Sequence, residues 1–224
     1  MINGNSPAKG GSGIGRRRRA ALREGGPSYT ARREEVVQVA AQLFREKGYE
    51  RTTLNDVASA LGTDRASLYY YVGSKEELLQ EIVRRVLIQN LEMAERVIDR
   101  VATGRQKIEE IIREMIVSFD DNYPHMFVYI EDIGRISRHD DEWSRDVIHR
   151  TKRFEKIVVE ILDQGRSDGS LRLETPSRLS AWALFGMVNW CHRWYHPGGR
   201  HSPEEVASAF ASIFCSGLAA FPSL

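Results

Sequence analysis

Cysteine is scarce in this chain, and its scarcity argues against two kinds of protein. Only two of the 224 residues are cysteines, too few for the disulfide framework of a small secreted domain or for a cysteine-rich zinc site. Cys191 and Cys215 each lie in an apolar helical pattern. We therefore expect two reduced core residues in a cytoplasmic protein that is long enough to bury a sizeable core.

Long apolar runs are absent as well. No stretch approaches the ~20 apolar residues of a membrane-spanning helix, and no apolar run follows the arginines near the N-terminus. We therefore expect neither a membrane partner nor a secretory signal.

The patterns of common active sites are also missing. The sequence contains no nucleophile elbow, no phosphate-binding loop and no zinc-ligand cluster. The glycines of residues 11–15 imitate a nucleotide-binding loop, but no predicted strand precedes them. His192 and His196 are four residues apart, a spacing that can hold a metal, but no third ligand accompanies them, so we interpret them as a surface pair. The sequence predicts a protein that is not an enzyme and has no cofactor.

Positive charge is concentrated at one end of the chain. Residues 1–33 contain eight basic residues and one acidic residue, a net charge of +7, whereas the rest has a net charge of −6. This asymmetry predicts salt-sensitive attraction of a polyanion to that end. Residues 1–28 are rich in Gly, Ser, Pro and Arg without periodicity, and we expect a disordered basic arm. Arg16–Arg19 could follow a DNA minor groove or add only non-specific attraction.

Residues 53–78, TLNDVASALGTDRASLYYYVGSKEEL, predict two short helices and the start of a third. Thr53 and Asp56 have the spacing of a capping box, and apolar residues follow at helical spacing. Gly62 ends the first helix because glycine readily adopts positive φ, and Thr63 or Asp64 caps the second. This order is that of a helix–turn–helix. A second capping box, formed by Ser74 and Glu77, begins the third helix.

The second short helix carries Arg65, Ser67 and three tyrosines within seven residues. So many exposed hydrogen-bonding side chains exceed what packing needs and suit a DNA groove. The alternative is an ordinary packed helix with surface tyrosines.

Residues 30–79 resemble the DNA-binding domain of the TetR family of bacterial transcription regulators. The matching residues are Thr52-Thr53, Asp56-Val57-Ala58, Leu61-Gly62, Leu68-Tyr69-Tyr70-Tyr71-Val72 and Ser74-Lys75-Glu76-Glu77-Leu78. Two positions depart from the family pattern: Ala66, where Gly or Pro is common, and Val72, where Phe is more frequent. The resemblance implies a DNA-binding surface made of Thr53, Arg65, Ala66, Ser67, Tyr69, Tyr70, Tyr71 and Lys75.

Within this surface we expect three roles. Arg65 can bond a guanine edge with two donors. Tyr69 and Tyr70 are expected to reach bases or thymine methyl groups. The matching family positions imply phosphate contacts for Thr53, Ser67, Tyr71 and Lys75.

The whole chain is predicted to be all-α, with about nine helices. Its domains are expected to be the arm at residues 1–28, the helix–turn–helix at 29–75, and a ligand-binding and dimerisation domain at 76–224. The helices are expected at about 30–47, 54–61, 64–72, 75–101, 105–122, after Pro124, 141–165, 176–195 and 203–218, the first of them capped by Thr30.

The C-terminal part suggests two tasks. The helices at 176–195 and 203–218 are apolar over more than one face, and in TetR-like proteins the last two helices form a dimer interface, so we expect a homodimer on a palindromic duplex. Large apolar side chains on neighbouring helices also predict an effector cavity, although each of them taken alone is more typical of an ordinary core residue. The predicted lining is Met115, Phe119, Met126, Phe127, Ile130, Trp182, Phe185, Asn189, Trp190 and Arg193, with Asn189 or Arg193 meeting a polar group of the ligand.

Residues 189–199 weakly resemble TetR-type regulators of fatty-acyl or steroid breakdown, which implies an acyl-CoA thioester as effector. A multidrug-type efflux regulator is the alternative within the family, and an architectural DNA-binding protein without effector is the alternative outside it. Repression is the family's usual mode, so the resemblance implies a repressor.

Overall fold

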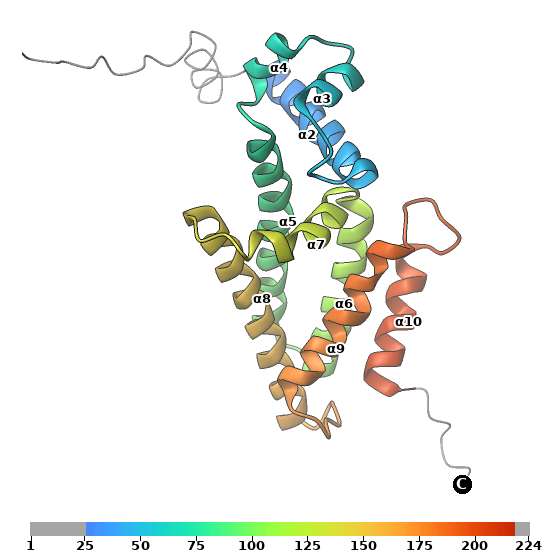
Figure 1. The fold of residues 1–224 in the computed structure, drawn as a ribbon. Helices are drawn as coiled ribbons and strands as arrows, with labels where there is room; N and C mark the ends of the chain where they lie inside the picture. Colours follow the sequence, from blue (N-terminus) through green and yellow to red (C-terminus); the bar gives the residue numbers. More distant parts are fainter. Residues whose placement is uncertain (1–25, 218–224) are drawn as a thin grey trace, which may run out of the picture. The chain divides into compact units, whose positions relative to one another are not determined.

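The computed structural model describes residues 26–217, which form nine α-helices, one short 3₁₀-helix and no strand (Figure 1). The predicted all-α fold is therefore confirmed. The elements are α2 (Pro27–Lys47), α3 (Leu54–Ala60), α4 (Arg65–Tyr71), α5 (Lys75–Ile98), α6 (Gly104–Asp121), α7 (His125–Ile136), α8 (Glu142–Ser167), α9 (Ser177–Asn189), η1 (Trp190–Arg193) and α10 (Pro203–Ser216). The predicted basic arm falls almost entirely outside the described residues. Among the described helices, none is long and apolar enough to cross a membrane.

The chain divides into two compact units, Met1–Glu81 and Ile82–Leu224. Helix α5 contributes residues to both units, because it begins at Lys75 and ends at Ile98. The first unit contains α2, α3 and α4, which pack against one another in all three pairs. Its buried core residues are Val36, Val37, Ala40, Ala41, Phe44, Val57, Ala58, Leu68, Val72, Leu78 and Leu79.

The capping residues of the first unit fix where its short helices begin and end. The Thr53 hydroxyl accepts from the Asp56 backbone N–H at 3.2 Å, and the Asp56 carboxylate accepts from the Thr53 N–H at 2.8 Å, so the predicted capping box is confirmed. After α3, Gly62 has a φ of +63°, the left-handed region that glycine enters without steric cost. The sharp turn between α3 and α4 depends on this residue.

Two predicted helix starts differ from the structure. Thr30 does not cap α2, which begins at Pro27 behind Gly26; proline suits the first turn because its missing N–H would have no intrahelical partner there. At α5, the Ser74 hydroxyl accepts from the Glu77 N–H at 3.0 Å as predicted. The Glu77 carboxylate, however, accepts from the N–H of Gly73 at 2.8 Å.

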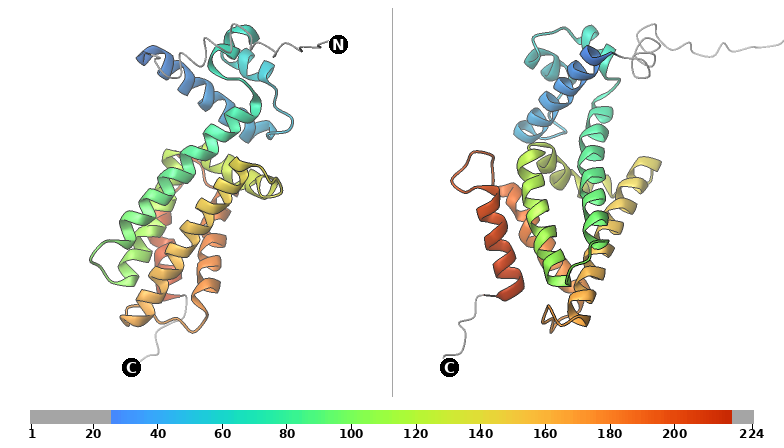
Figure 2. Two further views of the ribbon diagram at one scale, coloured as in Figure 1. Left: turned by 90° about the vertical axis from the view of Figure 1, so that its left-hand side faces the viewer. Right: turned by 180° about the vertical axis from the view of Figure 1, so that it is seen from behind.

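The second unit is a helical bundle. Helix α6 packs against α8 and α10, and α8 packs against α9; the rear view in Figure 2 shows α10 alongside α6. Apolar residues of α6 at helical spacing form the centre of the core: Ile108, Ile111, Ile112, Met115, Ile116 and Phe119. Helix α9 ends at Asn189, earlier than predicted, and the chain continues as η1.

Helices α6 and α8 meet at a pair of glycines. A Cβ added to Gly104 would lie 2.2 Å from the Cα of Gly165, so only glycine permits this approach. Next to it, the buried Lys107 ammonium donates to the Ile98 carbonyl at 2.6 Å and to the Gln164 side chain at 3.0 Å. These bonds compensate the buried charge and join the end of α5 to α8.

Candidate DNA-binding surface and effector cavity

Helix α4 is capped by Asp64. Its carboxylate accepts from the Ser67 backbone N–H at 2.9 Å and from the Ser67 hydroxyl at 2.8 Å. These hydrogen bonds lower the pKa of Asp64 below its usual range, because they stabilise the ionised form. The Ser67 hydroxyl proton is therefore already donated to Asp64. A phosphate is an acceptor, so the expected phosphate contact requires Ser67 to exchange this bond.

Arg65 is exposed at the start of α4 and is positioned by Tyr69, one helical turn later. Its guanidinium donates to the Tyr69 hydroxyl oxygen from Nη2 at 2.8 Å and from Nε at 3.2 Å, and its Cζ lies 5.4 Å from the centre of the Tyr69 ring. Arginine carries five N–H donors. Three of these donors remain for another partner, enough for a bidentate contact with guanine.

Tyr70 and Tyr71 belong to an aromatic cluster with Tyr29 of α2. The Tyr29 ring stacks on Tyr71 with centroids 5.3 Å apart and meets Tyr70 edge-on at 5.4 Å. Tyr29 was not identified from the sequence, because it lies before the helix start that we predicted. Tyr70 and Tyr71 are half-buried, so their rings support the fold while their exposed parts can serve a contact.

Thr53 and Lys75 are each held by neighbouring backbone or capping groups. Lys75 Nζ donates to the carbonyls of Tyr49 at 2.9 Å and Glu50 at 3.1 Å, and it lies 4.3 Å from the centre of the Tyr49 ring. One ammonium N–H remains for a phosphate. Ala66 is exposed without a hydrogen-bonding side chain. The first unit therefore brings all eight predicted residues onto α4 or the helix starts that flank it.

The second unit contains a largely apolar cavity with about 600 Å³ of empty space, counting its opening to solvent. Five helices contribute to its wall. The lining residues are Leu87, Asn90, Leu91, Met115, Met126, Tyr129, Arg150, Thr151, Phe154, Glu155, Phe185 and Asn189. The wall therefore includes three residues of α5.

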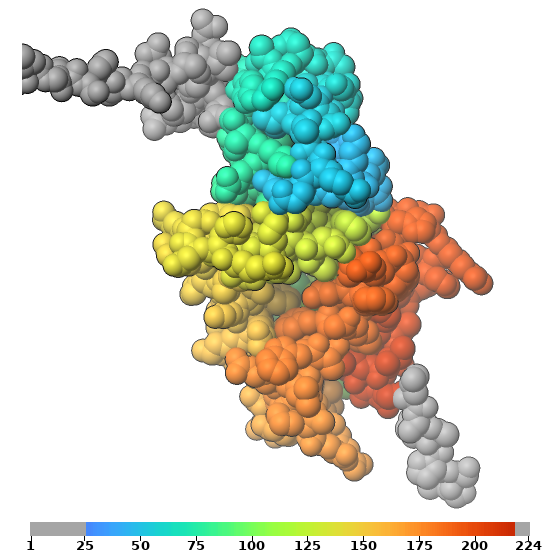
Figure 3. Space-filling view, in the orientation of Figure 1, coloured from blue at the N-terminus to red at the C-terminus, as the bar shows by residue number. Residues whose placement is uncertain are grey.

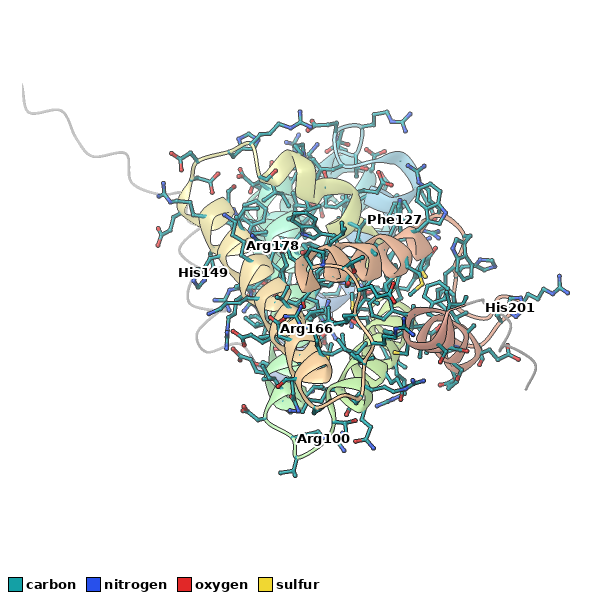
Figure 4. The ribbon with its side chains drawn as sticks, turned by 90° about the horizontal axis from the view of Figure 1, so that it is seen from below. Arg100, Phe127, His149, Arg166, Arg178 and His201 are labelled. Carbon is teal, nitrogen blue, oxygen red and sulfur yellow. The ribbon has the colours of Figure 1, made fainter. Side chains whose placement is uncertain are left out.

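Four of the ten predicted ligand residues line this cavity: Met115, Met126, Phe185 and Asn189. Phe119 is buried in the core. Phe127, Ile130, Trp182, Trp190 and Arg193 do not line the cavity; Phe127 instead lies beside the end of α9 (Figure 4), with its ring 5.8 Å from that of His192.

The cavity contains several polar groups that we did not predict from the sequence. The Thr151 hydroxyl donates to the Val147 carbonyl at 2.8 Å, so the Tyr129 hydroxyl, 3.1 Å away, donates to Thr151. Burial raises the pKa of Tyr129, which stays neutral. Arg150 donates from Nε to Asp146 at 2.8 Å, and this bond raises its pKa. No sequence signal marked these residues, since polar positions of a long helix usually face solvent.

His192 and His196 are not the surface pair that we predicted, because only His196 is exposed. The His192 side chain is only 10% exposed, and its Nε2 lies 3.0 Å from the Glu131 carboxylate of α7. Its Nδ1 lies 2.6 Å from the Asn189 carbonyl. Figure 4 shows His149 and His201 on opposite sides of the second unit. Across residues 26–217, no three potential ligands gather as a metal site.

Helices α9 and α10 present an apolar face to solvent. Along α9, Leu179 is 52% exposed, Trp182 54%, and Trp190, just past its end, 60%; on α10, Ile213 is 41% exposed. Ala183 and Gly186 lie on the same exposed stripe of α9, and Figure 3 shows α9 in orange at the surface of the molecule. Contiguous exposed apolar groups of this kind indicate a protein interface.

A short helix, a glycine turn and a second short helix with an exposed arginine define a helix–turn–helix protein. Residues 36–82 match the model of bacterial regulatory proteins of the tetR family, and residues 101–218 match that of the tetracyclin repressor-like C-terminal domain. The chain belongs to the TetR family of bacterial regulatory proteins.

Individual relatives agree with this assignment. The chain is 29% identical over 195 residues to the HTH-type transcriptional repressor KstR2 of Mycolicibacterium smegmatis, covering 86% of this chain and 93% of the relative. It is similar to the structure of PfmR from Thermus thermophilus, a TetR family regulator, with 32% identity and a TM-score of 0.73 over 83% of this chain and 99% of the other. It is also similar to the structure of the ketosteroid transcriptional regulator KstR2 of Mycobacterium tuberculosis, with 25% identity and a TM-score of 0.79 over 83% and 94% of the two chains.

Proposed function

We propose that this protein is a homodimeric repressor that binds a palindromic operator and is released by an effector in the cavity of the second unit. The effector is a bulky apolar molecule with an anionic part, such as an acyl-CoA thioester. The protein acts by binding alone, without a catalytic step, a cofactor or a membrane partner, and we place it in the cytoplasm.

Two copies are needed because one α4 helix is too short to read a whole operator. A helix of seven residues contacts a few base pairs, and two such helices about 34–36 Å apart read two half-sites together. The exposed apolar face of α9 and α10 supplies the contact between copies. Its three tryptophans, Trp182, Trp190 and Trp194, are 54%, 60% and 42% exposed in the single chain and suit the centre of an interface.

Helix α5 forms part of the cavity wall, and this is the main structural support for control by an effector. Leu87, Asn90 and Leu91 line the cavity, and the same helix begins at Lys75, within the first unit. A ligand that displaces this wall acts directly on a helix shared by both units. A nearly complete switch from bound to free DNA requires a differential affinity of on the order of 5 kcal/mol.

The chemistry of the lining supports an anionic rather than a cationic effector. Both Nη groups of Arg150 are without a hydrogen bond to the described residues, since only its Nε donates to Asp146. The charge of Glu155 is paired with Arg178 at 3.4 Å. Both lining charges are therefore paired, but the two Nη groups of Arg150 remain able to donate to a carboxylate or phosphate. One similar protein is described as a ketosteroid regulator, and this supports an effector whose acyl group contains a ring.

The proposal is tested by selecting duplexes from a random pool with the full chain and then adding candidate effectors. We expect a palindromic consensus, two copies per duplex in sedimentation, and release by acyl-CoA thioesters at concentrations where coenzyme A itself has no effect. A panel of hydrophobic cationic drugs is the comparison. Release by the drugs and not by thioesters would replace the proposed effector class, and no selected sequence would overturn the proposed function.

A further inference from the structure

Asn90 of α5 stands between two compartments of the second unit. On one side it lines the apolar cavity with Leu87 and Leu91. On the other side it lines a polar groove between α5 and α6, whose remaining residues are Arg85, Gln89, Met93, Arg96, Glu114, Val117, Ser118, Asp121 and Asn122. Asn90 therefore places an amide in the wall between an apolar space and a polar one.

The orientation of this amide is fixed by a chain of hydrogen bonds on its polar side. The Asn122 amide donates to the Ser118 hydroxyl oxygen at 3.1 Å, and the Ser118 hydroxyl donates to Asn90 Oδ1 at 3.0 Å. Since Oδ1 accepts this bond, the NH₂ group of Asn90 points the other way. Its acceptor there is the Met126 sulfur at 3.8 Å.

A thioether sulfur is a weak acceptor. Asn90 is half-buried, and its NH₂ group has an unmet capacity to donate at a place where Met126 also lines the cavity. A half-buried donor with a weak partner gains from a carbonyl oxygen that takes the partner's place. Asn189 offers a second amide in the same wall, and its side chain makes no hydrogen bond to the described residues.

We infer that Asn90 determines effector specificity by donating a hydrogen bond to a carbonyl oxygen carried on the apolar part of the ligand. The preferred effector class is accordingly an apolar molecule with a ketone or acyl carbonyl, and a plain hydrocarbon of the same shape binds without this contact. This inference rests on the proposed effector cavity.

The test uses two probes that differ in one carbonyl: 2-decalone and decalin. Their affinities for the full chain are measured by equilibrium dialysis with gas chromatography. In Asn90→Leu we expect decalone to bind roughly three- to tenfold more weakly, the worth of one neutral hydrogen bond, while decalin affinity is unchanged or higher. Gln89→Leu is the matched control, because Gln89 is an adjacent α5 amide that lines the polar groove and not the apolar cavity. It should leave both affinities unchanged.

A spectroscopic measurement separates recognition from packing. The carbonyl ¹³C resonance of labelled decalone should shift downfield on binding to the wild-type protein, as a hydrogen-bonded carbonyl does, and this shift should shrink in Asn90→Leu. Equal changes in affinity for decalone and decalin, or an unaltered ¹³C shift in the variant, would overturn the role of Asn90 and leave the cavity proposal standing. Binding of neither probe to the wild-type protein would overturn the proposed effector cavity and this inference with it.

Discussion

From the contact between Arg65 and Tyr69 we predict how a substitution of Tyr69 changes the affinity for the operator. In the free protein the guanidinium is held over the Tyr69 ring by bonds of 2.8 and 3.2 Å to the hydroxyl oxygen. Tyr69→Phe removes that acceptor and keeps the ring. The arginine then samples other rotamers, and binding must restrict it again.

The magnitude follows from the entropy of the arginine side chain. Fixing an arginine costs up to ~2 kcal/mol of rotamer freedom. If the bond to the Tyr69 hydroxyl already restricts about half of this freedom, its loss weakens operator binding by about 1 kcal/mol, roughly fivefold in Kd. Arg65→Ala removes the base contact itself and should cost about 1–3 kcal/mol, with relaxed preference at one position of each half-site.

The assay is fluorescence anisotropy with the selected operator, repeated for duplexes altered at each position. A double-mutant cycle shows whether Tyr69 acts through Arg65. If it does, Tyr69→Phe leaves the operator affinity almost unchanged in the Arg65→Ala background. A full fivefold loss in that background would mean that the Tyr69 hydroxyl contacts DNA itself and does not act by positioning Arg65.

Two further predictions concern stability. Gly104→Ala places a Cβ 2.2 Å from the Gly165 Cα and should lower the free energy of unfolding, measured by urea denaturation, by about 1–3 kcal/mol. Gly134→Ala is the control, because no atom lies within 4 Å of its Cβ, and it should be neutral or stabilising. Equal effects of the two substitutions would contradict the close approach of α6 and α8. The hydrogen bond from Lys47, followed by those from Thr53, holds the pKa of Asp56 well below its ordinary 3.8. Because the folded-state pKa is the lower one, this stabilisation is complete above about pH 4 and is lost as pH falls through the folded-state value. Thermal melting of the wild-type protein should therefore fall more steeply below pH 4 than that of an Asp56→Asn variant, and parallel curves would contradict this.

Local sequence rules predicted the helix–turn–helix well, because its boundaries depend on neighbouring residues. The Thr53–Asp56 capping box, the Gly62 turn and the Asp64 cap each involve groups at most a few residues apart in the chain. The start of α2 was missed because Thr30 is a common capping type, yet Pro27 fits the first turn better. The contact of Tyr29 with the α4 tyrosines joins residues about 40 positions apart, beyond the reach of a local pattern.

The cavity was only partly predictable for a related reason. Apolar periodicity indicates that a helix has a buried face, and so Met115 and Met126 were identified. It does not tell which apolar face meets a ligand space and which meets another copy of the chain. Trp182 and Trp190 were assigned to the cavity on composition, but they are 54% and 60% exposed. Tryptophan fluorescence should therefore report on the apolar face of α9 rather than on direct contact with an effector.

In the proposed function, occupancy of the cavity in the second unit controls operator binding. Leu91→Trp fills part of the cavity from α5, and Gln89→Trp places the same group on the polar groove as a control. Operator complexes of the wild-type protein and both variants should be titrated with the thioester that releases the wild-type protein. We predict that Leu91→Trp binds the operator and resists release, while Gln89→Trp is released like the wild type. Release of Leu91→Trp at the same thioester concentration as the wild type would contradict the account.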